Sequence, residues 1–152
     1  MDYSFGVVYR TALDYSAPVA LFGGLGNSAF LGITFDASNN SLWISGWSSS
    51  EVRNYSLTGT LLSSFTGPTS SLTCLALDPA TGTLWMGSQG QQGVFWEYSR
   101  AGTQLQTVTL PALASQNTLG GEFAFAAVPE PATWLQLLGG LVLLGLAARR
   151  RR

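Results

Sequence analysis

An internal repeat constrains the fold of this chain more than any other feature. The segment ITFDASNNSLWI, residues 33–44, matches LALDPATGTLWM, residues 75–86, so that Asp36 aligns with Asp78 and Trp43 with Trp85 at an offset of 42 residues. A second pair of segments, residues 54–60 and 97–103, matches at an offset of 43 residues. Periods of about 40 to 45 residues are typical of architectures in which like units pack against their neighbours.

Each repeat unit predicts four short strands separated by turn residues. Four strands per unit of this length is what a β-propeller blade requires. The predicted fold class is therefore all-β: a partial β-propeller-like stack of four-stranded antiparallel blades, two complete and the flanks partial, plus one C-terminal transmembrane helix. The expected strands are residues 30–35, 41–46, 51–56 and 60–65, then 72–77, 83–87, 93–99 and 104–109.

The sequence supplies fewer blades than a closed propeller contains. Residues 7–22 fit the last two strands of a preceding unit, and residues 121–126 fit the start of a third complete one. That makes at most about three blades, whereas closed propellers use about four to eight. Two alternatives follow: the chain is a fragment of a longer propeller, or it is a short open stack whose edge strands a partner covers.

The repeated Asp-x-x-x-x-x-Leu-Trp element, at residues 36–43 and 78–85, resembles blades of NHL, YncE-like or gluconolactonase-like propellers. We expect Asp36 and Asp78 to accept backbone N–H bonds in hairpin turns, with metal binding or acid–base chemistry as the alternative. Trp43 and Trp85 are expected to pack between neighbouring blades.

Few other residues are candidates for chemistry. Cys74 lies in an apolar run and is expected to be buried and unreactive. Trp47 and Trp96 could stack on a sugar, but packing between blades is favoured. The remaining acidic candidates, expected on solvated strand edges, are Glu51, Glu97 and Glu122.

The charge distribution excludes several functions. The chain has no His, which removes His-dependent catalytic triads, and no zinc-ligand spacing or phosphate loop occurs. Before the last four residues it carries three Arg against eight carboxylates, so a nucleic-acid partner is excluded. We predict no catalytic residue, no metal and no cofactor, and hence no enzyme.

The C-terminal tail has three parts. An extended Val128-Pro129-Glu130-Pro131 segment precedes an apolar run from Trp134 to Ala148. At about 1.5 Å per residue this run can span a bilayer with help from its flanks, and the positive-inside rule places its arginine end in the cytoplasm. The anchor residues are Trp134, Leu135, Leu137, Leu138, Leu141, Val142, Leu143, Leu144 and Leu146, and the stop residues are Arg149, Arg150, Arg151 and Arg152.

This tail resembles the PEP-CTERM protein-sorting signal of Gram-negative envelope and biofilm proteins. The resemblance implies a transient partner, the membrane-embedded cysteine transpeptidase exosortase, which cleaves near Pro-Glu-Pro. It also implies contact with inner-membrane lipid, a periplasmic body before processing, and a cell-surface or extracellular location afterwards. We expect a propeller-like region over residues 1–127 and a sorting tail over residues 128–152.

The expected function is a non-enzymatic surface or matrix protein that binds an envelope polysaccharide or a protein. The alternatives are an uncleaved single-pass anchored protein and a fragment of a lactonase-like propeller enzyme. Residues 1–10 lack the basic start and apolar run of a signal peptide. Together with the blade count, this leads us to expect a chain truncated at its N-terminus.

Overall fold

The computed structural model describes residues 6–26 and 29–123 of the chain, and these residues are all-β. Besides strands they contain one short 3-10 helix, Pro111–Leu113. The strands are β1 (Val8–Arg10), β2 (Val19–Phe22), β3 (Phe30–Asp36), β4 (Ser41–Gly46), β5 (Glu51–Ser56), β6 (Leu61–Thr66), β7 (Leu72–Leu77), β8 (Leu84–Ser88), β9 (Gln91–Tyr98) and β10 (Gln104–Thr109).

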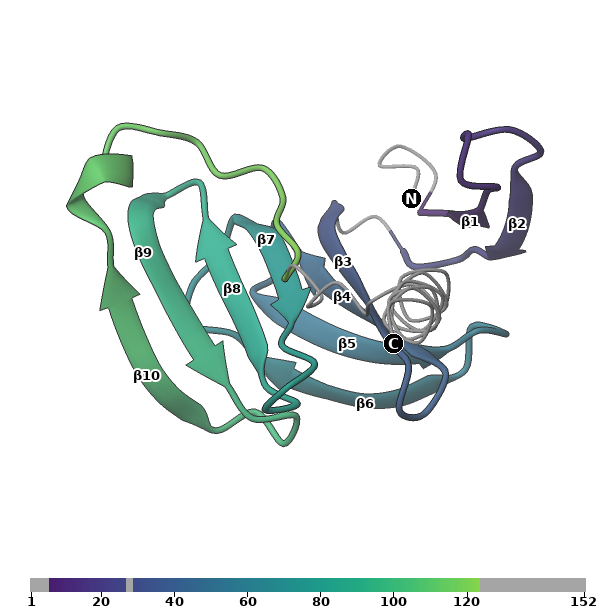
Figure 1. Ribbon diagram of the computed structural model, residues 1–152. Helices are drawn as coiled ribbons and strands as arrows, with labels where there is room; N and C mark the ends of the chain where they lie inside the picture. The colour runs from purple at the N-terminus through teal and green to yellow at the C-terminus, as the bar shows by residue number, and fades with distance from the viewer. Residues whose placement is uncertain (1–5, 27–28, 124–152) are drawn as a thin grey trace, which may run out of the picture.

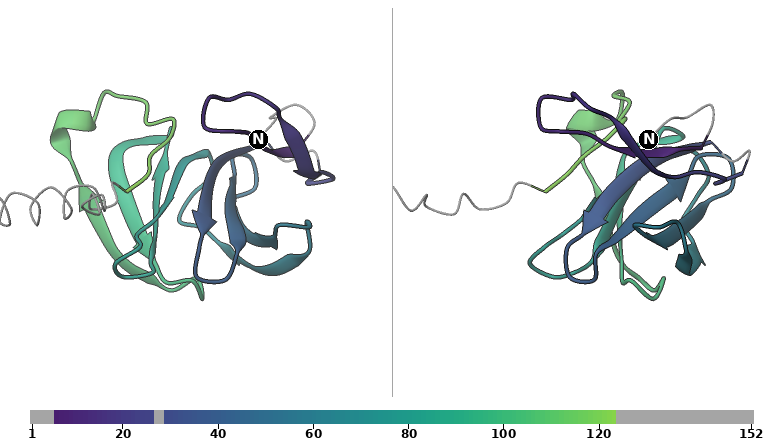
Figure 2. Two further views of the ribbon diagram at one scale, coloured as in Figure 1. Left: turned by 45° about the vertical axis from the view of Figure 1, so that its right-hand side comes forward. Right: turned by 90° about the vertical axis from the view of Figure 1, so that its right-hand side faces the viewer.

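Two four-stranded antiparallel sheets, β3-β4-β5-β6 and β7-β8-β9-β10, form the centre of the molecule. They lie side by side as successive twisted blades, with β3 next to β7 (Figures 1 and 2). All eight predicted strands of the two repeat units are present, and their ends differ from the prediction by at most two residues. The largest difference is at β9, which begins at Gln91.

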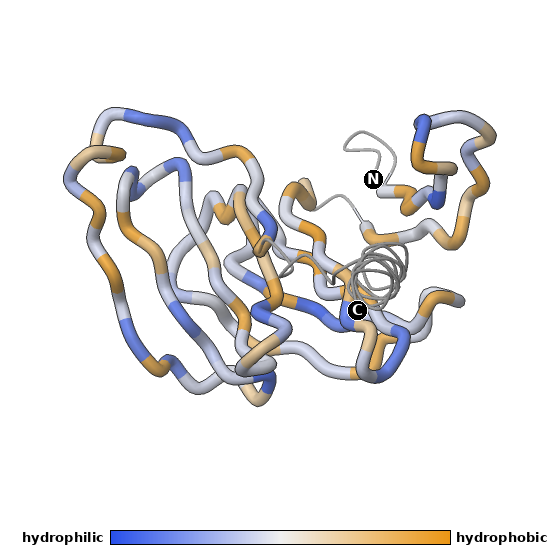
Figure 3. Tube along the Cα trace, viewed as in Figure 1, coloured by the Kyte–Doolittle hydropathy of each residue, from blue (hydrophilic) through white to orange (hydrophobic). Residues whose placement is uncertain are grey.

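Polarity separates the strands from the turns that connect them. Figure 3 shows hydrophilic residues gathered in turns such as the one between β3 and β4. The first strand of the second sheet, β7, is buried along its whole length, whereas the last strand, β10, is mostly exposed. This gradient from a buried inner strand to an exposed outer one is what packing of blades around an axis produces.

A hydrophobic core fills the space between the two sheets. Trp43 and Val52 of the first sheet pack with apolar residues of the second, including Trp96. Trp43 is only 1% exposed, which confirms the prediction that it packs between blades. Trp85, its repeat equivalent, lies on the opposite face of the second sheet and is half-buried. There its ring meets the edge of the Phe123 ring at a centroid distance of 6.3 Å.

The N-terminal hairpin β1-β2 repeats the contacts of β5-β6. Phe22 lies 5.5 Å from Tyr55 between ring centroids, just as Phe65 lies 5.7 Å from Tyr98. The hairpin therefore supplies the last two strands of a preceding blade, as predicted for residues 7–22. We call it the half-blade.

The start of a third complete unit was expected at residues 121–126. Residues 121–123 form no strand, and residues 124–126 lie outside the described residues. Within the described residues, no helix has the length and apolarity needed to cross a membrane. The predicted span from Trp134 to Ala148 lies outside them.

Candidate functional site

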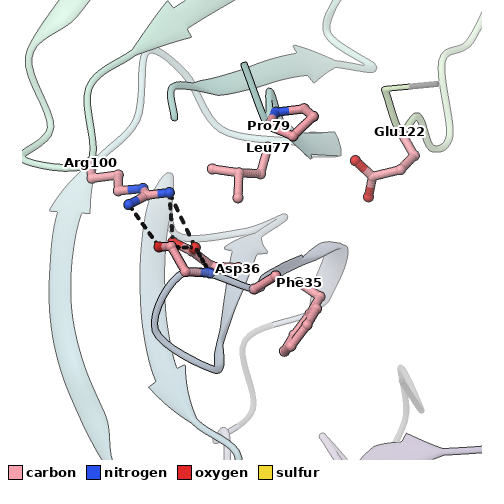
Figure 4. A pocket seen from close by; sticks show the side chains of 8 residues that line it. Phe35, Asp36, Leu77, Pro79, Arg100 and Glu122 are labelled. Carbon is pink, nitrogen blue, oxygen red and sulfur yellow. Dashed lines mark hydrogen bonds and ion pairs between the residues drawn. The ribbon is translucent and has the colours of Figure 1, made fainter. Parts of the chain in front are cut away.

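A cavity of about 300 Å³ lies where the two sheets meet, at the ends of β3 and β7. The ends of these strands supply apolar walls, and the segment that follows β10 supplies a carboxylate (Figure 4). Its lining residues are Phe35, Asp36, Ala37, Ser38, Leu77, Pro79, Arg100 and Glu122.

Asp36, a buried residue of the cavity lining, is held in place by four donors. Its Oδ1 accepts hydrogen bonds from the backbone N–H of Ser38 at 3.0 Å and from the Ser38 hydroxyl at 2.6 Å. The Trp43 indole N–H points at Oδ2 from 3.4 Å. The fourth donor is Arg100 of the second sheet, whose Nη2 lies 3.1 Å from each carboxylate oxygen. Asp36 is thus a turn cap, as predicted, and also half of an ion pair between blades.

Glu122 reaches the inner strands from the opposite side of the cavity (Figure 4). Its Oε2 accepts a hydrogen bond from the Thr34 hydroxyl at 2.9 Å. The same hydroxyl oxygen accepts the backbone N–H of Leu77 at 3.2 Å. One threonine of β3 therefore links β7 and the segment after β10. Among the described residues, no arginine forms a salt bridge with Glu122.

These groups give the cavity two chemical functions. The apolar part of the cavity lining comes from Phe35, Leu77 and Pro79. The Asp36–Arg100 pair is internally neutralised, so the Glu122 carboxylate is the acceptor that remains for ligand hydroxyl or ammonium groups. Such a combination suits reversible binding of a small amphipathic group.

The other acidic candidates lie elsewhere. Asp78 caps its turn by accepting the Ala80 backbone N–H at 2.8 Å, so its predicted role is confirmed. Glu97 was expected on a solvated strand edge, and this prediction is wrong. Its side chain accepts hydrogen bonds from Thr83 and Gln106, and the residue is only 9% exposed. Glu51 is partly buried and forms a salt bridge with Arg53 of the same strand. Within the described residues, no group of three His, Cys, Asp or Glu side chains is placed to hold a metal ion.

Cys74 is buried on the face of β7 that points away from the first sheet. Desolvation by burial, with a further contribution from the negative charge of Glu122, raises the pKa of its thiol. Trp96 is buried between the sheets as expected, and Trp47 is half-buried.

The sequence alone did not reveal the Arg100–Asp36 pair. The repeat holds a signal for it only in retrospect: Arg100 takes the position of Leu57, so the second unit carries a cation where the first carries an apolar residue. To predict the pair, one must also know that the turn holding Arg100 in the second unit lies against Asp36 of the first.

Solved structures similar to this chain share its propeller-like fold. Virginiamycin B lyase from Staphylococcus aureus is 16% identical, with a TM-score of 0.54, and covers 74% of this chain and 37% of its own. The C-terminal WD40 domain of Sif2 is 15% identical, with a TM-score of 0.51, and covers 71% of this chain and 32% of its own. The chain thus spans about a third of the length of these structures. At such identities the likeness shows the fold alone.

The C-terminal tail matches a protein-family model. Residues 127–152 match the family model described as the PEP-CTERM protein-sorting motif. This confirms the resemblance based on residues 128–131, the apolar run and the four terminal arginines, and it implies export and processing by an exosortase. No curated protein sequence matches the chain. The motif, anchor and stop residues, 128–131, 134–146 and 149–152, lie outside the described residues.

Proposed function

We propose that this protein is an exported surface or matrix protein that an exosortase releases from the inner membrane and that displays a non-enzymatic, propeller-like binding module. The observation that carries the proposal is the sorting-motif match over residues 127–152. In this scheme residues 1–127 form the displayed body, and residues 128–152 form a tail that is cleaved after export.

The apolar run and the arginine cluster support the membrane step. A helix over Trp134–Ala148 would hold the chain in the bilayer, and Arg149–Arg152 would keep the last turn in the cytoplasm. Proline disfavours helical backbone in the residue before it, so Pro129 and Pro131 favour an extended peptide, which is the shape a transpeptidase needs in its substrate.

The cavity between the blades supports binding over catalysis. Asp36 is committed to a turn and to an ion pair, and Glu122 accepts a hydrogen bond from Thr34. Both carboxylates are therefore part of the contacts that join the blades. The apolar lining and the Glu122 carboxylate together suit the apolar face and hydroxyl groups of a sugar, and we propose an envelope polysaccharide or a surface protein as ligand.

Processing in cells tests the proposal. The chain carrying a cleavable export leader would be expressed in a host with an exosortase and in an otherwise identical host without one. We expect the first host to release a shortened product that lacks Arg149–Arg152 by intact-mass measurement. We expect the second to retain the full-length form in its membrane fraction.

Substitution of the motif separates sorting from simple anchoring. Pro129→Ala combined with Pro131→Ala should leave a full-length, membrane-retained form, whereas Pro18→Ala, an exposed proline of the body, should be processed normally. A mature product in the exosortase host that still contains the arginine cluster would contradict the proposal and identify an uncleaved, single-pass anchored protein.

A further inference from the structure

The same blade-to-blade interface occurs twice in this molecule, and one copy is incomplete. In the half-blade Val8 pairs with Phe22, just as Val52 of β5 pairs with Phe65 of β6. Thus β1 and β2 occupy the places of β5 and β6. In the complete blade β5 also pairs with β4, but among the described strands β1 pairs with β2 alone. Within the described part of the chain, the edge of β1 that corresponds to the β4 side therefore has no paired strand; we call it the open edge.

A groove of about 410 Å³ lies at this open edge. Its walls come from the half-blade and from the first complete sheet, and they are apolar apart from Arg10 at the rim. The lining residues are Val8, Tyr9, Arg10, Leu21, Ile33, Phe35, Leu42 and Leu57. Val8 and Leu42 also belong to the core that joins the half-blade to this sheet. The groove is thus a continuation of an interface that already exists within the chain.

The complete interface shows what fills the equivalent place. There Trp43 of β4 packs in one cluster with Leu75, Leu77 and Leu84. By the repeat offset of 42 residues, these three leucines correspond to Ile33, Phe35 and Leu42, which line the groove.

Equivalent residues of the two interfaces differ in their exposed fraction. Leu77 is 7% exposed beneath its tryptophan, whereas Phe35 is 48% exposed in the groove. The groove therefore has the walls of a tryptophan site, and no described residue fills it.

We propose that this groove binds one extended strand of a partner polypeptide, which adds to the open edge of β1 and places a bulky aromatic side chain where Trp43 lies in the complete interface. Trp43 pairs with Asn54, two residues after Val52, and Arg10 stands two residues after Val8. The aromatic residue of the docked strand thus lies opposite Arg10. Backbone hydrogen bonds along the edge supply affinity, and the apolar groove supplies selectivity for the aromatic side chain.

A peptide copied from this chain is the most direct probe. The fluorophore-labelled peptide of residues 39–46, NNSLWISG, carries the strand that fills the complete interface. Full-length protein in detergent micelles should bind it saturably by fluorescence anisotropy. The same peptide with Trp43→Ala should bind about tenfold more weakly or worse, because the aromatic burial is lost. Absent binding, or equal binding of the two peptides, overturns the proposal.

Two leucine substitutions locate the binding surface. Leu57 lines the groove and is 37% exposed, whereas Leu61 of β6 is 51% exposed and does not line it. Leu57→Asp should abolish peptide binding because it places a carboxylate in the apolar lining, and Leu61→Asp should leave it unchanged. Equal binding by both variants overturns the proposal.

A labelling measurement does not depend on how well the aspartate variants fold. Since Cys74 is buried, a cysteine placed by Leu57→Cys reports its own accessibility to a maleimide. The peptide should slow labelling at position 57 and leave labelling of Leu61→Cys unchanged. Unchanged labelling at both positions overturns the proposal. Concentration-dependent self-association that Leu57→Asp removes would also overturn it, because the occupant would then be a second copy.

Discussion

At the scale of single residues, Asp36 and Asp78 share one position of the repeat but have different surroundings. Asp36 is fully buried and contacts Ser38, Trp43 and Arg100, whereas the half-buried Asp78 caps its turn through a single backbone bond. Asp36→Ala leaves the buried Trp43 N–H without its acceptor and leaves the partly exposed Arg100 guanidinium with the Ser38 hydroxyl alone. We expect it to lower the free energy of unfolding by about 2 to 3 kcal/mol, after discounting Arg100 for its exposure.

Asp78→Ala is the matched control, and we expect a loss of about 0.5 to 1 kcal/mol. Urea unfolding of the two variants checks the difference. Equal losses would show that the ion pair between the blades adds nothing to the turn cap.

The raised thiol pKa of Cys74 predicts a stability that depends on pH. The folded state holds the thiol in its neutral form, so unfolding becomes more favourable once the unfolded thiol can ionise. The stability tied to Cys74 is therefore complete below the ordinary thiol pKa of 9.0 and is lost as the pH rises through the higher folded value.

The expected result is that the wild type loses more stability than Cys74→Ala between pH 8 and pH 10, measured by urea unfolding. Burial also raises the pKa of Tyr98, but that group is present in both proteins and cancels in the comparison. Parallel pH profiles for the two proteins would contradict a shifted thiol.

The sequence predicted residue roles where a local rule applied and missed them where distant segments meet. Both aspartate caps follow from the turn that each begins, so they were predictable from neighbouring residues. Arg100 and Glu122 act on residues more than 60 positions away, and no local pattern encodes that distance. Glu97 was misjudged because its hydrogen-bond partners, Thr83 and Gln106, lie on both sides of its strand.

At the scale of elements, a glycine in a turn between strands allows two successive blades to approach closely. Gly102 has φ of +84°, and a Cβ added there would lie 2.5 Å from Cβ of Phe65 on the neighbouring blade. Gly102→Ala therefore adds a steric overlap between blades to the cost of a left-handed backbone. We expect a loss of about 2 to 4 kcal/mol in the free energy of unfolding.

Substitution of Gly24 isolates the cost of the left-handed backbone from the cost of steric overlap. Its φ is +77°, but a Cβ added there would meet nothing within 4 Å. Gly24→Ala should therefore lose only about 1 to 2 kcal/mol, the cost of the backbone conformation. Thermal or urea unfolding of both variants checks the prediction, and equal losses would mean that the blades separate without cost at this turn.

The elements themselves were largely readable from the sequence because the repeat presents each strand twice. Two matching units fix the same boundaries independently, so the errors are small. The segment after β10 was harder, since it belongs to neither unit. It runs back past the ends of β9 and β8 toward β7 (Figure 1). The Thr73 hydroxyl donates to the Thr118 carbonyl, and the Phe123 ring packs against Trp85. A regular strand was expected at its end, and residues 121–123 instead form an irregular covering segment.

At the scale of the whole molecule, the half-blade and the two complete sheets each pack only on their neighbours within residues 6–26 and 29–123. The half-blade packs on the first complete sheet, and that sheet packs on the second. Stability of such a stack is the sum of the intrinsic terms of the units and the interface terms between them. The interface between the two complete sheets depends on Trp43, which is the largest of its nearly fully buried side chains.

This arrangement predicts that Trp43→Ala destabilises both complete sheets together. Removing a buried tryptophan costs about 3 to 5 kcal/mol, a large part of the total stability of a domain this size. We expect amide hydrogen exchange to quicken in β3–β5 and in β7–β9 by similar factors, because the lost contacts belong equally to both sheets.

Trp85→Ala is the control from the same repeat position. It contacts the covering segment around Phe123, so its effect should stay within β7–β9 and that segment. If Trp43→Ala raised exchange in only one sheet, the two blades would be independent folding units, and the interface would contribute little to holding them side by side.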